Sequence, residues 1–524
     1  MLDFAPLRLG TLTLVTLTQK SNLTKKASLN AVASVLDYGV RLVVGFIINP
    51  LLVSGLGDFG YGIWQVLGRL IGYVTPASGR PTQALKWTVA HQQSSADYHE
   101  KRSQVGRALA VWLLFLPLLV PLGLILVWFS PIWLHASPDF YLTVRLAASV
   151  LLLNLIATDL SAIPESVLTG ENLGYKRMGL SACLSGIGGG LTVLALYLKG
   201  GLIGVALATL ASTILTGLFF WQVTRTYVTW FGIARPKWGE IRQFFQLSVW
   251  FQLWNLVMTL MRSSDVVLLG VLSSAELVTT YSLTKYVPET IINIIAIVVV
   301  GVAPGLGGII GSGNLKKAMG VRHEIMSVTW LIVAVVGSTI LLWNQSFLKL
   351  WVGASYDAGP LPTLAIVLLV TQLVLIRNDA AIINLTLDLR NKVIIGFVST
   401  TISLVLAGLA IEVFDLGVLG LCLGFLIGRL ILSIAYPWSV GRFFGIPFLV
   451  QLRGIVRPGL TLLALFAAAL YGSHFLQATT WLSLIGSAAV TSGVALAIAL
   501  CVGLSNSQRT NLKNRGLQLL KRHH

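Results

Sequence analysis

The chain has 524 residues, of which 55% are hydrophobic and only 11% are charged, and its formal net charge is +18. Soluble proteins carry about 25% charged residues, so this composition excludes an ordinary soluble domain. Apolar runs of about 20 residues recur from Ser28 to Leu504, and each is long enough to cross a bilayer. The positive charge fits a membrane protein better than a nucleic-acid-binding protein, because most Lys and Arg residues fall in alternate short loops.

Fourteen apolar segments are predicted to cross the membrane, so the expected fold class is an all-α integral membrane protein with about 14 transmembrane helices. The predicted spans are residues 29–55, 61–80, 108–129, 141–164, 178–198, 201–222, 246–271, 277–303, 324–343, 361–387, 392–412, 416–437, 455–477 and 480–504.

The links between the spans differ in charge. One side carries only Lys199 and Lys349, whereas the other side carries basic clusters such as Lys101–Arg107 and the C-terminal tail. The positive-inside rule places the basic side in the cytoplasm, and an even number of spans then places both termini there. Residues 1–27 have no small-residue cleavage site followed by a soluble domain, so they are interpreted as a cytoplasmic tail or interfacial segment rather than a signal peptide. The expected location is the bacterial inner (plasma) membrane.

The two halves of the chain repeat landmarks 216 residues apart. The offset relates Arg69 to Lys285, two cations in the second and eighth spans, and Gly201 to Gly417. It also relates a spaced set of small residues, namely Gly204, Ala208 and Ser212, to Gly420, Gly424 and Gly428. Any two apolar helices can align by chance, but the same offset at separate landmarks favours a true repeat.

The repeat predicts two pseudo-symmetric six-helix lobes plus a C-terminal helix pair, a common plan for transporters. The predicted parts are an N-terminal tail at 1–27, an N-lobe at 28–222, a cytoplasmic linker at 223–245, a C-lobe at 246–437, a linker with the last two spans at 438–504, and a basic cytoplasmic tail at 505–524.

Motifs for common enzyme and cofactor chemistry are absent from the sequence. It has no phosphate-binding loop of the GxxxxGK[ST] type, no HExxH and no CxxC, so neither ATP hydrolysis nor a metal site is predicted. The outer loops are too short to suggest a glycan polymerase or ligase. No cofactor is therefore expected, apart from H⁺ or Na⁺ as a coupling ion.

Charged residues inside the spans are the candidate functional groups, because charge is costly in a membrane. The spacing predicts that Asp37 pairs with Arg41, Arg262 with Asp265, and Lys285 with Glu289. Such pairs, and cations near span ends such as Arg145 and Arg429, have a purely structural explanation in ion pairing and snorkelling. The cations in and near the spans are Arg41, Arg69, Arg145, Arg262, Lys285, Arg377 and Arg429.

Taken together, these cations favour a positively charged cavity that attracts an anion such as pyrophosphate, whose oxygens Arg grips well. The candidate substrate-binding residues are Arg41, Arg69, Arg262, Lys285 and Arg377. The carboxylates are candidates for H⁺ or Na⁺ coupling, although a structural paired role is equally open for each. They are Asp37, Asp159, Asp265 and Asp379.

Two stretches resemble a known family. The first, LVSGLGDFGYGIW, has Leu56-Gly57 followed by Tyr61-Gly62, and the second, MRSSDVVLLGVLSSAELVTTYSL, has Asp265 before an aliphatic run that ends in Gly270. Both resemble the polysaccharide (O-antigen) flippases of the multidrug/oligosaccharidyl-lipid/polysaccharide (MOP) exporter superfamily. The plain turn at Leu272–Glu276 departs from the pattern.

The resemblance implies a flippase that moves polyprenyl-pyrophosphate-linked oligosaccharide to the outer leaflet by alternating access, for cell-surface polysaccharide synthesis. The implied partners are that glycan, membrane lipid and a glycan polymerase complex, without nucleic acid and without enzymatic activity. Three alternatives remain open. They are a multidrug exporter of the same superfamily, a membrane-embedded glycan polymerase or ligase, and a non-catalytic partner of a glycan synthase.

Overall fold

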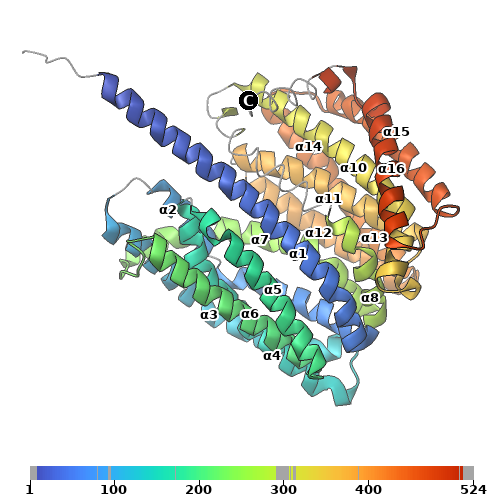
Figure 1. The fold of residues 1–524 in the computed structure, drawn as a ribbon, viewed down its shortest axis with the longest axis horizontal. Helices are drawn as coiled ribbons and strands as arrows, with labels where there is room; N and C mark the ends of the chain where they lie inside the picture. The colour runs from blue at the N-terminus through green and yellow to red at the C-terminus, as the bar shows by residue number, and fades with distance from the viewer. Residues whose placement is uncertain are drawn as a thin grey trace, which may run out of the picture. The chain divides into compact units, whose positions relative to one another are not determined.

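The computed structural model describes residues 9–79, 81–92, 96–171, 173–290, 306, 309–310, 314–386, 389–506 and 508–510. Within this part of the chain every regular element is a helix (Figure 1), so the predicted all-α fold class is confirmed. The main helices are α1 (Leu9–Val74), α2 (Pro81–His91), α3 (Tyr98–Trp133), α4 (Tyr141–Gly170), α5 (Met178–Tyr197), α6 (Gly201–Tyr227), α7 (Trp238–Leu272), α8 (Ala275–Thr284), α10 (Leu315–Trp351), α11 (Pro360–Thr386), α12 (Leu389–Glu412), α13 (Gly417–Gly428), α14 (Leu430–Phe444), α15 (Phe448–Ser473) and α16 (Trp481–Ile498).

Twelve segments of the described chain are long and apolar enough to cross a membrane. The first of them, Leu36–Ser78, has 43 residues and covers most of both the first and the second predicted spans. The predicted eighth span begins in α8, and its residues 291–303 lie outside the described residues. One segment thus accounts for two predicted spans, and one further predicted span is only partly described. The expectation of about fourteen crossing helices is therefore confirmed. The predicted tails are only partly described, since α1 begins at Leu9 and residues 511–524 are outside the described part.

Local sequence signals explain where several helices start and bend. Gly57 interrupts α1 with a positive φ of 71° that a side chain would disfavour, and it separates the two predicted spans. The side chains of Ser274 and Asn314 accept hydrogen bonds from the first turns of α8 and α10 and so satisfy N–H groups that have no helical partner. Gly445, with φ 71°, ends α14 in the left-handed conformation.

The described chain forms two compact units. Unit 1 consists of Met1–Gly55, Val74–Ser130 and Asp139–Gln252, and unit 2 consists of Leu56–Tyr73, Pro131–Pro138 and Leu253–His524. These bounds follow packing, and they differ from the predicted lobes in one important place. The segment Leu56–Tyr73, which the repeat assigns to the N-lobe, packs as a part of unit 2.

In unit 1, α4 packs along α6, and α5 packs on the other flank of α6 (Figure 1). Helix α2 packs on α4. The apolar core at one end of this unit comes from α2, α3, α4 and the link after α6, with Leu85, Val111, Val167 and Leu168 fully buried. This burial fixes the helix ends that carry the basic residues of the unit.

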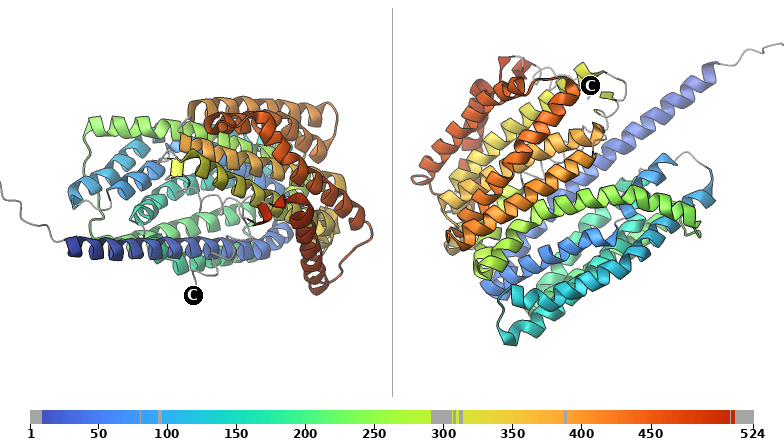
Figure 2. Two further views of the ribbon diagram at one scale, coloured as in Figure 1. Left: turned by 90° about the horizontal axis from the view of Figure 1, so that it is seen from above. Right: turned by 180° about the vertical axis from the view of Figure 1, so that it is seen from behind.

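In unit 2, α15 and α16 both pack on α10, and α11 contacts α10, α13 and α14 (Figures 1 and 2). Glycines allow α13 to lie very close to α12. A Cβ atom added at Gly424 would be 2.3 Å from Ala407 Cα, and one at Gly428 would be 2.4 Å from Ser403 Cα. The predicted close packing through small residues is therefore present in this copy of the repeat.

The repeat also has a counterpart in the backbone. Lys199 and Gly201, in the turn before α6, have φ values of 54° and 54°, and Asp415 and Gly417, before α13, have 50° and 48°. Each pair is separated by the same 216 residues that the sequence comparison indicates. Positive φ is rare for residues other than glycine, so this match is a specific sign that both turns descend from one unit.

Candidate functional site

A buried ion pair lies at the centre of the candidate site in unit 2. Lys285, which follows α8, forms a salt bridge with Asp265 of α7, and Tyr281 donates a hydrogen bond of 2.7 Å to the same carboxylate. The backbone N–H of Val266 donates to the other carboxylate oxygen. Asp265 and Lys285 are only 3% and 6% exposed, so the pair is removed from solvent and depends on its internal partners.

Arg69 and Glu289 form a second, looser pair beside the first. Their charged groups are 3.8 Å apart, and each side chain is roughly one third exposed. Arg69 also lies close enough to interact with the charge of Asp265. Both residues belong to unit 2, so this pair extends the buried one towards a more accessible region.

Close backbone packing holds Arg69 in this place. Gly62 lies against the start of α8, where an added Cβ would be 1.9 Å from the carbonyl oxygen of Ala275. The hydroxyl of Thr279 donates a hydrogen bond of 2.6 Å to the carbonyl of Asp58. One helical face from Asp58 to Arg69 is thus fixed against α8. The Gly62 of the family-like motif has a packing role here.

Arg429 is a further member of the cluster, which corrects the prediction that it lies near a span end and snorkels. The apolar segment Gly417–Phe444 continues on both sides of it, so Arg429 is far from either end. Its side chain is 3% exposed and donates to the carbonyl oxygen of Met261, and its charge interacts with that of Asp265. A buried cation at mid-span is a candidate functional group.

Arg262 and Arg377 carry positive charge without an acidic partner. Neither forms a salt bridge among the described residues, and Nη1 of Arg377 is buried without a hydrogen-bond partner there. The two guanidinium groups are close enough to repel each other, and Arg262 is exposed. Two like charges held together favour the binding of an anion between or beside them.

The pairings predicted from helical spacing are therefore only partly correct. Arg41 does pair with Asp37 in α1, at 3.1 Å. The other two predicted pairs, Arg262–Asp265 and Lys285–Glu289, are wrong, because Lys285 reaches across to α7 and Glu289 pairs with Arg69. Spacing along one helix identifies possible partners, but it does not weigh them against partners on a neighbouring helix.

The cluster has a positive surplus and little free space. Five cations and two carboxylates contribute to it, which leaves three positive charges; these residues are Arg69, Arg262, Lys285, Arg377, Arg429, Asp265 and Glu289. A cavity of about 20 Å³ lies among Met261, Arg262, Asp265, Lys285, Glu289, Leu369, Val370, Leu373 and Arg429. That is room for one water molecule, so the charges are packed closely in this conformation.

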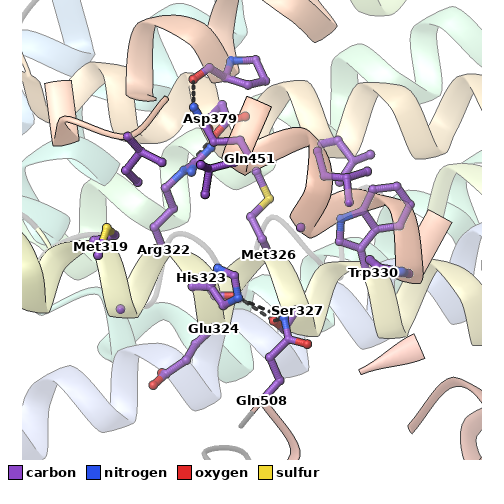
Figure 3. Close-up of a pocket in the computed structure, with 18 of the residues that line it drawn as sticks. Met319, Arg322, His323, Glu324, Met326, Ser327, Trp330, Asp379, Gln451 and Gln508 are labelled. Carbon is purple, nitrogen blue, oxygen red and sulfur yellow. Dashed lines mark hydrogen bonds and ion pairs between the residues drawn. The ribbon is translucent and has the colours of Figure 1, made fainter. Parts of the chain in front are cut away.

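The remaining predicted site residues lie elsewhere. Asp379 forms a salt bridge of 2.8 Å with Arg322 of α10 (Figure 3). Asp37, Arg41 and Asp159 belong to unit 1, where Asp159 is 8% exposed. No sequence signal links Arg322 to Asp379, because the two are 57 residues apart on different helices.

Among the described residues, no group of three or more His, Cys, Asp or Glu side chains is arranged to hold a metal ion. Fixed cations and carboxylates, such as those of the cluster, can bind an anion and exchange ion-pair partners.

Comparison with known proteins agrees with this architecture. Residues 109–306 match a family model described as polysaccharide biosynthesis protein. A search among curated proteins finds no match.

Three solved structures are similar in fold at low sequence identity. An inward-facing conformation of a multidrug resistance MATE family transporter of the MOP superfamily superposes with a TM-score of 0.63 at 15% identity, over 78% of this chain and 97% of that one. An outward-facing conformation of such a transporter gives 0.58 at 15% identity, over 80% and 96%. A MOP superfamily transporter from Pyrococcus furiosus gives 0.57 at 15% identity, over 80% and 96%. The chain thus has the fold of MOP-superfamily membrane transporters, and the match of residues 109–306 to a polysaccharide biosynthesis family agrees with the predicted resemblance.

Proposed function

We propose that this protein is a flippase that moves polyprenyl-pyrophosphate-linked oligosaccharide from the cytoplasmic to the outer leaflet of the inner membrane, with both of its termini in the cytoplasm. The observation that carries the proposal is the surplus of three positive charges inside the spans of unit 2. A pyrophosphate carries matching negative charge, and the planar guanidinium groups of Arg262 and Arg377 suit its oxygens.

The cluster suggests how the substrate binds. Arg262 and Arg377 are available to bind an anion because no carboxylate among the described residues neutralises them. Arg69 is loosely held by Glu289 at 3.8 Å and exchanges this partner for a phosphate oxygen at low cost. Lys285 stays with Asp265 and keeps α7 and α8 together. Binding energy at the headgroup is then available to shift the balance between inward-facing and outward-facing states.

Coupling to an ion gradient is part of the proposal. Buried carboxylates in spans often mark ion paths, and Asp379 and Asp159 are the candidates that lie outside the cationic cluster. Asp379 is held by Arg322, so protonation or Na⁺ binding at this carboxylate releases a cation and changes the contact between α10 and α11. Transport in liposomes with either a pH gradient or a Na⁺ gradient separates the two ions, and equal transport without any gradient contradicts coupling.

A drug exporter of the same superfamily is the second candidate, since two of the similar structures are multidrug resistance transporters. The Pyrococcus furiosus transporter is described by a reverse polarity of its binding pocket that suggests a different function. The sign of the charge at the binding site therefore distinguishes a drug exporter from a flippase. A cationic drug needs acidic groups to bind, whereas the cluster in unit 2 repels it.

The experiment uses the full chain in liposomes with two probes. The first is a polyprenyl-pyrophosphate disaccharide with a fluorescent label on the sugar, whose movement is followed with a quencher that cannot cross the bilayer. The second is the cationic dye ethidium. We expect flipping of the labelled lipid and no transport of ethidium. Ethidium transport without lipid flipping contradicts the proposal and supports the exporter.

A cell-based measurement tests the same proposal and its rivals. Cells depleted of the protein are expected to retain lipid-linked glycan on the cytoplasmic side and to recover outer-leaflet glycan when the intact gene is restored. Normal flipping with a loss of glycan polymerisation identifies instead a polymerase, a ligase or a partner in a polymerase complex.

A further inference from the structure

The link between α6 and α7, residues 228–237, presents a basic surface in unit 1. It begins directly after Tyr227, the last residue of a helix that is long and apolar enough to cross a membrane (Figure 1). Four cations lie from residue 225 to residue 242, so the positive-inside rule assigns this end of α6 to the cytoplasm, as the proposed function also requires. The link is therefore next to the headgroups of the cytoplasmic leaflet.

Contacts with α3 hold the backbone of this link. The N–H of Ala234 donates to the carbonyl of Arg102 at 3.2 Å, and Nε of Arg102 donates to the carbonyl of Trp230 at 2.8 Å. Gly106 allows the close approach, since a Cβ there would be 2.0 Å from the carbonyl oxygen of Ala234 and 3.2 Å from the ring of Pro236. One side of the link is thus fixed against α3, and the other side is open.

The residues that approach Gly106 alternate along the link with exposed ones. Ile233, Arg235 and Lys237 are exposed, and Ile233 is 56% exposed. Trp238 continues the exposed set at the start of α7 and is 69% exposed. An aliphatic side chain and an indole beside two cations match the composition of a membrane–water interface, where the rings enter the headgroup layer and the cations meet lipid phosphates.

Three more exposed cations adjoin the link. Arg225 is in the last turn of α6, and Arg242 is one turn after Trp238 on the same face of α7. Lys176, in the turn before α5, has its ammonium group 4.6 Å from the centre of the Tyr227 ring. The link patch is defined here by the five exposed cations Lys176, Arg225, Arg235, Lys237 and Arg242.

The link patch carries positive charge that no salt bridge neutralises. None of its five cations forms a salt bridge within the described part of the chain. From residue 225 to residue 242 the sequence contains a single acid, Glu240, and this carboxylate is bridged to Arg107 at 2.8 Å. Clusters of about four to eight cations directly after a membrane-crossing helix are typical of sites for anionic lipid headgroups.

We propose that the link patch binds anionic phospholipids of the cytoplasmic leaflet, such as phosphatidylglycerol. The lipid phosphates lie beside the five cations, and the exposed side chains of Ile233 and Trp238 enter the layer between headgroups and acyl chains. The membrane is the occupant that the position favours, because the patch starts where α6 leaves the bilayer. The bound lipid holds this end of unit 1 at the leaflet surface and involves no residue of the cationic cluster in unit 2.

The test uses the purified full chain in nanodiscs of phosphatidylcholine mixed with phosphatidylglycerol. The lipids that remain bound after transfer to mild detergent are counted by native mass spectrometry. We expect phosphatidylglycerol to be retained over phosphatidylcholine by about tenfold at low salt, and less at high salt, because exposed charges are screened. Amide hydrogen exchange of residues 228–237 is expected to be slower in the mixed discs than in discs of phosphatidylcholine alone.

Substitutions then locate the preference. The double variant Arg235→Gln/Lys237→Gln is expected to lower it by about fivefold or more without a change in thermal midpoint, since neither residue has an acidic partner to lose. Lys199→Gln/Lys349→Gln is the matched control, because it removes two exposed cations from the opposite side of the membrane. A control that loses as much preference as the double variant shows that the patch is not the site. Equal retention of both lipids by the native protein also overturns the proposal.

Discussion

Two charged clusters of this protein show opposite designs. In unit 1, three cations and three carboxylates lie at the ends of α3, α4 and α7 and so balance in number. Lys101 pairs with Glu171, Arg107 pairs with Glu100 and Glu240, and Arg102 donates to a backbone carbonyl. In unit 2, five cations face two carboxylates within apolar spans. The balanced set joins helix ends, and the unbalanced set has charge left for a ligand.

The geometry of the balanced cluster supports a structural role. Glu171 accepts from Lys101 at 3.2 Å and from the indole N–H of Trp230 at 2.8 Å, and Arg102 donates to the carbonyl of Trp230 at 2.8 Å. Arg107 bridges Glu100 and Glu240. Every cation has a partner, and the network fixes the link between α6 and α7. Charge counts alone do not separate this cluster from a binding site, but the matching of partners does.

The largest effect is expected when the buried ion pair of unit 2 is broken. Lys285→Met leaves Asp265 buried without its main partner, and we expect a loss of about 3–5 kcal/mol in the free energy of unfolding. Denaturant titration in detergent measures it. The double variant Asp265→Leu/Lys285→Met is expected to regain most of this stability, because it removes both charges. A stable single variant would show that Tyr281 and Arg429 alone hold the carboxylate.

A backbone contact gives the next largest effect. Gly62→Ala places a Cβ against the carbonyl oxygen of Ala275, so α8 or the Leu56–Tyr73 segment must shift, and we expect a loss of about 1–3 kcal/mol. Transport falls as well, because Arg69 moves. The matched control is Gly68→Ala, which has open space around the new Cβ and is expected to be neutral or slightly stabilising. Equal stability of the two variants would contradict the close approach.

Removal of the unpaired cations separates binding from folding. Arg262→Gln with Arg377→Gln is expected to lower lipid flipping by about tenfold or more while leaving the thermal midpoint unchanged, since neither residue has an acidic partner to lose. Arg145→Gln is the control for the loss of a positive charge outside the cluster, because Arg145 is stacked on Trp128 at 4.0 Å in unit 1. If the double variant flips lipid at the native rate, or if the control loses as much flipping, the charge surplus is not what drives transport.

The smallest effect is expected in the balanced cluster. Partial burial would raise the pKa of the Glu240 carboxyl, but the hydrogen bond from the Lys237 N–H and the charge of Arg107 outweigh it, so the pKa lies below its usual value. A lowered pKa means that this contact stabilises the protein at neutral pH and is lost as pH falls through the lowered value. Hydrogen exchange at the start of α7 should therefore rise at acidic pH, and Glu240→Gln should remove that pH dependence without affecting flipping at neutral pH.

The sequence predicts the parts of this protein that depend on local composition. Apolar length identifies the crossing helices, and the offset of 216 residues that pairs Arg69 with Lys285 is matched by the positive φ of Lys199 and Asp415. The candidate cations Arg69, Arg262, Lys285 and Arg377 belong to unit 2 and lie in or beside its cluster, and their role in substrate binding stays a prediction. These features are predictable because the cost of burying charge in lipid acts on each residue separately.

Partner choice is what the tertiary structure decided. Lys285 pairs with Asp265 rather than with Glu289, Asp379 pairs with Arg322 of a neighbouring helix, and Arg429 is buried at mid-span. Each of these contacts joins different helices, and its energy depends on distances that only helix packing fixes. The positive surplus was thus encoded in the amino-acid sequence, whereas the identity of the unpaired cations was determined by which helices lie within reach of each carboxylate.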